Sequence, residues 1–198
     1  WYDVYGEWVP SEHRFPNGLK PVVDYAHEKG MLFGIQTEVE GGRGNWETNR
    51  VAQEHPEWFG SNHVMRLERD DAGSYMRDEL TRVVADYYAD MYRNEFIPDP
   101  LYTHEGTSTI RDGFIENDYW RYYDNWYRAW EHLRATFPGI ILQQCANGGT
   151  REDLGAVARF DESYTNEAPT RPSLQAFSGK TLALPPEILT IGIATTEE

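Results

Sequence analysis

The stretch FPNGLKPVVDYAHEKGMLFGIQTEVE, residues 15–40, contains the pattern that decides the fold. Its apolar residues recur with helical spacing and then meet a glycine, which predicts a helix over 18–29. The short apolar run 31–37 follows and ends in Glu38 and Glu40, as is typical of a buried strand that leads into a polar loop. The stretch therefore predicts one helix-and-strand unit of an α/β fold.

The same pattern returns twice further along the chain. A helical repeat over 75–87 precedes a strand-like run at 89–96, and an aromatic helix over 119–137 precedes a strand at 140–145. Helices that alternate with short buried strands predict a parallel sheet with helical crossovers. A doubly wound sheet and a (β/α)8 barrel, the TIM barrel, both fit this pattern.

Chemically useful side chains gather where the predicted strands end. Barrels build their active sites from the carboxyl ends of their strands. An open α/β sheet uses the same edge, but the glycines of GGRGN at 41–45 match neither the dinucleotide-binding fingerprint nor a phosphate-binding loop, which weakens a nucleotide-binding interpretation. The residues at the strand ends are Glu38 and Glu40, Arg93 and Glu95, Cys145 to Gly149, and Asn166 and Glu167.

Size and composition set limits on the class of protein. The 198 residues, 39% of them hydrophobic, are enough for one compact domain. The chain opens on Trp1 without the features of a secretion signal, so we expect a piece of a longer protein and assign no compartment. The tail after Pro169 is less patterned, and it predicts either a further strand and turn or an unrelated continuation.

Net charge and residue usage limit the classes of molecule that this chain is expected to bind. A formal net charge of −15 argues against nucleic acid, whose phosphates require Lys and Arg. No apolar run approaches the roughly 20 residues of a membrane helix, so we expect no membrane partner. The single Cys145 forms no internal disulfide, and CxxC zinc motifs are absent. The 14% aromatic content suits a sugar ligand, although most of these rings are expected in the core.

The order of several segments resembles glycoside hydrolase family 36, the melibiase-like α-galactosidases. The resemblance covers about residues 1–167 and implies a TIM barrel, present here as an incomplete portion with five or six of eight strands. It implies one catalytic-barrel domain over 1–198, with 169–198 less certain, a glycoside or oligosaccharide substrate, and no cofactor or metal. A homo-oligomer is compatible with it. The segments, in order, are GEW, RFPNGLKPVVDYAHEKGM, FGIQTEVE, HPEWF, YADMYRNEF, TIRDGFIENDYW and FPGIILQQCANGGTREDL.

The resemblance also assigns two catalytic carboxylates. Retaining glycosidases need a nucleophile and an acid/base about 5 to 5.5 Å apart. Alignment without gaps puts Glu95 at the family's nucleophilic aspartate and Glu167 at its acid/base aspartate. Each substitution adds one methylene and lengthens the reach by about 1.5 Å.

Both assignments have alternatives. Glu95 is otherwise a barrel-mouth acid paired with Arg93 or Arg111, and Glu167 is otherwise a solvated loop acid. If the alignment slips by a few residues, Asp161 and Glu162 become rival acids.

The rest of the implied sugar site departs from the family in part. Gln36 stands where the family has a tryptophan, and Ile97 stands where it has a sugar-binding asparagine, which leaves galactose specificity open. Glu38 is retained, and Arg93 takes the position of a basic residue that contacts the sugar. Trp8 is interpreted either as a sugar platform or as a staple for the first loop.

The segment that follows the strand at 140–145 keeps the family pattern. Cys145 lines the pocket in the family, although it is also interpretable as an ordinary buried residue. Gly148 and Gly149 would let the loop approach the sugar, with Arg151 and Asp153 expected to brace it as an ion pair.

Three functions follow. The first is a retaining α-glycosidase that hydrolyses terminal α-linked sugars by double displacement, and the second is a carbohydrate-binding relative without catalysis. The third is a barrel fragment that is inactive alone. His104 and Glu105 are interpreted as a loop pair in preference to a metal site.

Overall fold

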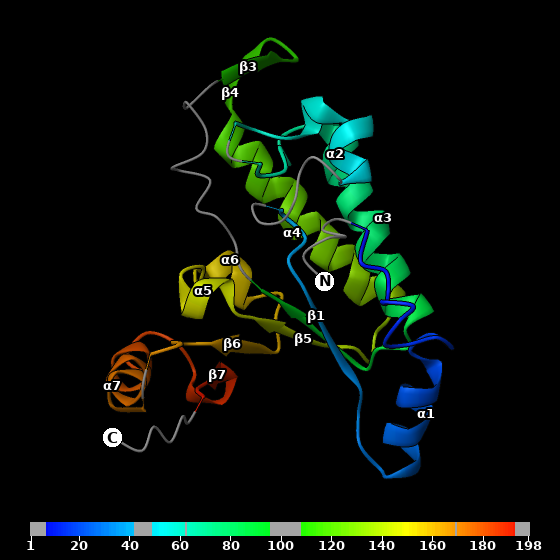
Figure 1. The fold of residues 1–198 in the computed structure, drawn as a ribbon. Coiled ribbons are helices and arrows are strands. Elements are labelled where there is room, and N and C mark those ends of the chain that lie inside the picture. Colours follow the sequence, from blue (N-terminus) through cyan, green and yellow to red (C-terminus); the bar gives the residue numbers. More distant parts are fainter. Residues whose placement is uncertain (1–6, 42–48, 62, 96–107, 169, 193–198) are drawn as a thin grey trace.

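The computed structural model describes residues 7–41, 49–61, 63–95, 108–168 and 170–192. Its centre is a sheet of five parallel strands in the order β1-β2-β5-β6-β7 (Figure 1). The bounds are Gly34–Thr37 for β1, Met91–Asn94 for β2, Ile141–Gln144 for β5, Glu162–Tyr164 for β6 and Leu189–Thr190 for β7. The predicted parallel sheet is therefore confirmed.

Strand order in space follows strand order in the chain. A doubly wound sheet would reverse this order at a switch point, whereas a singly wound sheet continues in one direction, as a barrel does. The strands of the described residues form an open sheet and do not close into a barrel. The α/β class is confirmed. The five strands of the described residues are fewer than the eight of a closed TIM barrel, in line with the expected incomplete portion.

Six of the helical segments precede or flank these strands. The bounds are Lys20–Glu28 for α1, Arg50–Glu54 for α2, Pro56–Trp58 for the 3-10 helix η2, Asp70–Asp86 for α3, Asp118–Thr136 for α4 and Leu154–Val157 for α6. The predicted helices 18–29, 75–87 and 119–137 correspond to α1, α3 and α4. Gly30, with φ of 72°, ends the first of these, as expected from its position.

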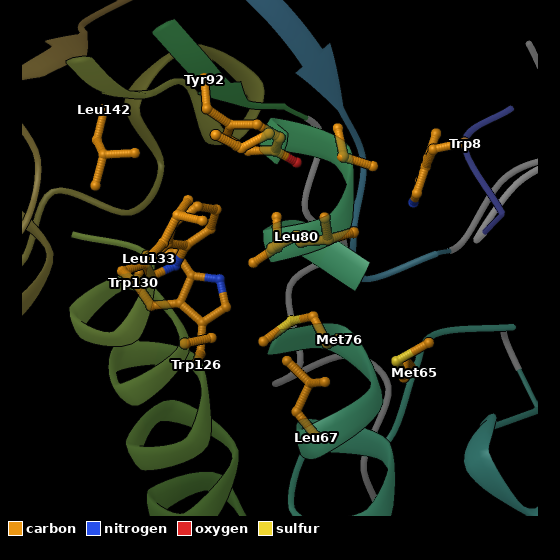
Figure 2. Close-up of a cluster of buried hydrophobic side chains, with 14 of the residues drawn as sticks. Trp8, Met65, Leu67, Met76, Leu80, Tyr92, Trp126, Trp130, Leu133 and Leu142 are labelled. Carbon is orange, nitrogen blue, oxygen red and sulfur yellow. The ribbon is translucent and has the colours of Figure 1, made fainter. Parts of the chain in front are cut away.

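The core lies between the sheet and the two long helices α3 and α4. Figure 2 shows Leu80 of α3 and Trp130 of α4 turned toward the same cluster, with Tyr92 of β2 above them. The rings of Tyr92 and Trp130 lie 5.6 Å apart, and Trp130 also contacts Trp126 in an edge-on arrangement. Much of the aromatic content is therefore structural.

Two further features complete the fold. A two-stranded antiparallel hairpin, β3 (Ser108–Arg111) and β4 (Phe114–Asn117), leads into α4 and lies at the top of Figure 1. The tail forms helix α7 (Thr170–Lys180), the 3-10 helix η4 (Pro186–Ile188) and strand β7, which pairs with β6. The tail thus continues the same sheet. Among the described helices, none has the length and apolar character needed to cross a membrane.

Candidate active site

One row of side chains crosses four strands at the same register. Gln36 of β1 pairs with Arg93 of β2, Arg93 with Gln143 of β5, and Gln143 with Glu162 of β6. Side chains at equal register in a parallel sheet lie on the same face. This polar row lies on the opposite face from Tyr92 and the core.

Arg93 is the centre of the site. Its Nε donates to the Glu95 carboxylate at 2.8 Å, and its two terminal nitrogens reach the Gln143 amide oxygen at 3.1 Å and the Cys145 sulfur at 3.0 Å. The guanidinium also lies 4.5 Å from the centre of the Tyr164 ring. Burial opposes its charge, but the contacts with Cys145 and Glu95 raise the pKa of Arg93, so the group remains a cation.

The two predicted catalytic acids lie on either side of Cys145. The Cys145 thiol donates to the Glu167 carboxylate at 3.2 Å, and Arg93 lies 3.9 Å from the same oxygen. One ligand atom each of Glu95, Cys145 and Glu167 falls within 4.8 Å of the others. Glu95 is buried at the end of β2, whereas Glu167 is exposed. The site therefore pairs a buried acid with a solvent-facing one.

Glycines allow this close approach. Gly148 and Gly149 lie in α5 (Ala146–Gly149) with φ of 73° and 83°, a conformation that favours glycine. A Cβ on Gly148 would lie 2.7 Å from the Glu167 backbone nitrogen, and one on Gly149 would lie 2.8 Å from the Thr165 carbonyl oxygen. Both glycines let the α5 turn pack against the segment that carries Glu167.

The Cys145 thiol is held in its neutral form. Burial is the main cause that raises the pKa of Cys145, and a hydrogen bond to Glu95 adds to it. Cys145, Glu95 and Glu167 are spaced so that they could hold a metal ion. Arg93 already places a positive charge beside the two carboxylates of this group.

The expected ion pair between Arg151 and Asp153 is wrong. Arg151 instead donates to both oxygens of Glu40, at 3.0 and 3.1 Å, and Tyr122 also donates to Glu40. Asp153 caps helix α6 by accepting from the Ala156 backbone nitrogen. The Asp153 carboxylate, which Arg151 was expected to bind, is instead used as the cap of α6.

The remaining residues predicted to bind the sugar differ in their burial. Trp8 is 2% exposed and packs in the core, and its carbonyl accepts from Tyr87, a position that matches the structural alternative to a sugar platform. Gln36 is exposed on β1, and Glu38 is buried directly after that strand. Ile97, His104 and Glu105 lie outside the described residues.

Asp161 and Arg111 have partners outside the group around Arg93, whereas Glu162 joins that group through Gln143. Asp161 pairs with Arg134 and accepts from the Leu142 backbone, at the start of β6. Glu162 accepts from Gln143, and Arg111 pairs with Asp70.

Three residues of the site were missed from the sequence. Gln143 and Tyr164 contact Arg93, and Lys180 of α7 donates to the Thr165 carbonyl at 2.8 Å and pairs with Glu152. Alternation along β5 was the available signal for Gln143, because it lies two residues before Cys145 and therefore on the same face.

The chain is similar in sequence to α-galactosidases. The family model described as Melibiase matches residues 3–196. An α-galactosidase of Escherichia coli is 27% identical over 199 residues, which cover 93% of this chain and 26% of that protein. α-Galactosidase C of Emericella nidulans is 29% identical over 204 residues and covers the same shares.

Solved structures show the same fold. A variant of the family 36 α-galactosidase AgaA from Geobacillus stearothermophilus, in complex with raffinose, superposes with a TM-score of 0.77 at 20% identity. The match covers 98% of this chain and 28% of that one. The chain therefore spans about a quarter of the length of the relatives that it matches.

Proposed function

The chain belongs to the melibiase family, and from that premise we propose that it carries the catalytic carboxylates of a retaining glycosidase. The substrate in this proposal is a terminal α-linked sugar, and an α-galactoside such as raffinose, the ligand of the AgaA variant, is the first to test. Glu95 acts as the nucleophile and Glu167 as the acid/base.

The spacing of the two acids is the observation that supports the mechanism. Oxygens of Glu95 and Glu167 lie within 4.8 Å of each other. Retaining glycosidases hold their carboxyl groups about 5 to 5.5 Å apart, whereas inverting enzymes leave roughly 6.5 to 9.5 Å for a water molecule. The short spacing favours direct attack on the anomeric carbon by one carboxylate.

The surroundings suit the two roles. Arg93 stabilises negative charge on the buried Glu95, as a nucleophile requires. Glu167 faces solvent, where it can protonate the leaving oxygen and then take a proton from water. A covalent bond between Glu95 and the sugar forms in the first step and is hydrolysed in the second.

Trapping with a mechanism-based α-galactoside inhibitor tests this proposal. We expect stoichiometric labelling of Glu95, read by mass spectrometry of its peptide. Labelling should be lost in Glu95→Gln and slowed in Glu167→Gln. The control is Glu28→Gln, an exposed surface change that should leave labelling at the parent rate.

The other outcomes distinguish the alternatives. Sugar binding without labelling or turnover would support a carbohydrate-binding relative. A broad, non-cooperative unfolding transition would support an inactive fragment. Undiminished hydrolysis by Glu95→Gln would overturn the assigned nucleophile.

A further inference from the structure

Gln143 bridges Arg93 and Glu162 on the face of the sheet opposite the core. Its amide oxygen accepts from Arg93 at 3.1 Å, and its amide nitrogen donates to Glu162 at 2.6 Å. Gln143 is 6% exposed, so water can hardly replace either of these hydrogen bonds.

The two neighbours fix which way the amide points. A guanidinium has only donors and an ionised carboxylate has only acceptors, so the oxygen must face Arg93 and the nitrogen must face Glu162. Gln143 is thus held between a cation and an anion, and reversal of the amide would break both hydrogen bonds.

The Tyr164 ring completes the support of the guanidinium. Its centre lies 4.5 Å from the Arg93 guanidinium, which allows a cation–π contact. Gln143 and Tyr164 therefore constrain Arg93 in two directions, while its Nε contacts Glu95.

We propose that Gln143 is a positioning residue that holds Arg93 against Glu95. The proposal rests on the retaining mechanism for its catalytic consequence, but the positioning itself does not depend on it. The hydrogen bonds of Gln143 reach Arg93 and Glu162, and Arg93 in turn contacts Glu95, so Gln143 acts on Glu95 through Arg93. Displacement of Arg93 would leave Glu95 without its charged partner and move it relative to the anomeric carbon.

Substitutions at Gln143 separate charge from shape. Gln143→Glu keeps the length of the side chain but places a second carboxylate beside Glu162, and it offers Arg93 an anion that competes with Glu95. Gln143→Leu keeps most of the volume and removes both hydrogen bonds. Gln144→Leu is the matched control, because Gln144 is a buried amide on the same strand whose partner is Asn94 on the other face.

The first measurement tests the position of the Arg93 side chain and does not depend on activity. In the full chain, nuclear magnetic resonance of the Arg93 Nε–H should show slow exchange with solvent in the parent. We expect the exchange rate to rise roughly tenfold or more in Gln143→Leu and to stay near the parent value in Gln144→Leu. An unchanged Arg93 signal in Gln143→Leu would overturn the proposal.

The second measurement tests the catalytic effect, through the rate at which the inhibitor labels Glu95. We expect the labelling rate of Glu95 to fall between about tenfold and a hundredfold in Gln143→Leu, with a smaller change in inhibitor affinity. In Gln143→Glu the pH dependence of labelling should change, because a new acid titrates beside Arg93. Labelling at the parent rate and with the parent pH profile in both variants would contradict the positioning role.

The two measurements distinguish the two proposals. If the parent is never labelled but the Arg93 signal responds to Gln143→Leu, the retaining mechanism fails and the positioning stands. If the parent is labelled and neither readout responds, the mechanism stands and the positioning fails.

Discussion

Arg151 and Glu40 form a buried ion pair with two parallel hydrogen bonds, although they lie far apart in the sequence. The pair joins the loop after β1 to the loop after α5. The centre of the Trp126 ring lies 4.5 Å from the Arg151 guanidinium carbon. The ring fills the space that water would otherwise occupy.

Removal of one partner of this pair should strongly destabilise the protein. We expect Arg151→Met to lower the free energy of unfolding by about 3 to 5 kcal/mol, because Glu40 is left charged and buried. Chemical denaturation measures this. Arg128→Met is the control, since Arg128 forms an exposed pair with Asp124 and should cost less than about 1 kcal/mol. Equal losses in the two variants would contradict the role of burial.

Gly148 should tolerate alanine less well than Gly18. Both have positive φ, but a Cβ on Gly18 meets no heavy atom within 4 Å, whereas one on Gly148 meets the Glu167 backbone nitrogen at 2.7 Å. We expect Gly18→Ala to cost about 1 to 2 kcal/mol from backbone strain alone. Gly148→Ala should cost roughly 1 to 3 kcal/mol more, because the backbone must move. Thermal unfolding of both variants checks the difference, and similar melting temperatures would argue against tight packing at Glu167.

The Cys145 thiol should make stability fall at high pH. Burial raises its pKa in the folded chain above the ordinary value of 9.0, so the unfolded chain ionises first as the pH rises. The stabilisation is complete below pH 9 and is lost above it, at about 1.4 kcal/mol per pH unit. Denaturation from pH 7 to pH 10 should therefore show a steeper decline for the parent than for Cys145→Ala. Parallel curves would mean that the thiol ionises equally in both states.

Leu133 and Leu182 provide a test of the core. Leu133 of α4 is 0% exposed, and Leu182 after α7 is 90% exposed. We expect Leu133→Ala to cost about 2 to 5 kcal/mol, because it leaves a cavity beneath the sheet. Leu182→Ala should stay within about 0.5 kcal/mol of the parent. Urea denaturation measures both, and a small effect at Leu133 would show that the helices α3 and α4 can close the gap.

Local periodicity was enough to predict the long elements. Helices α3 and α4 each bury one stripe of apolar residues, and α1 buries Val23. In each helix the apolar repeat is visible in the sequence alone. The short α5 was not predictable, because Asn147 and Gly148 take left-handed conformations that no periodic pattern encodes. The expected number of strands, five or six, agrees with the five strands of this sheet.

The site was predictable only where the family pattern reaches it. Glu95 and Glu167 were assigned by alignment, and the structure places them together. The partner of Arg151 was mistaken, because Asp153 is close in sequence while Glu40 is distant. The contact between Gln143 and Arg93 depends on strand register, which the sequence of either strand does not specify.

Because strand order follows chain order, the candidate site would be assembled in sequence as the chain leaves the ribosome. Arg93 and Glu95 emerge together and can pair early, before Cys145 and Gln143 reach them. Glu167 arrives last, only after β6 has emerged to join the sheet. During synthesis, at about 5 to 20 residues per second, Glu95 would thus wait for several seconds beside Arg93 before Glu167 stands opposite it.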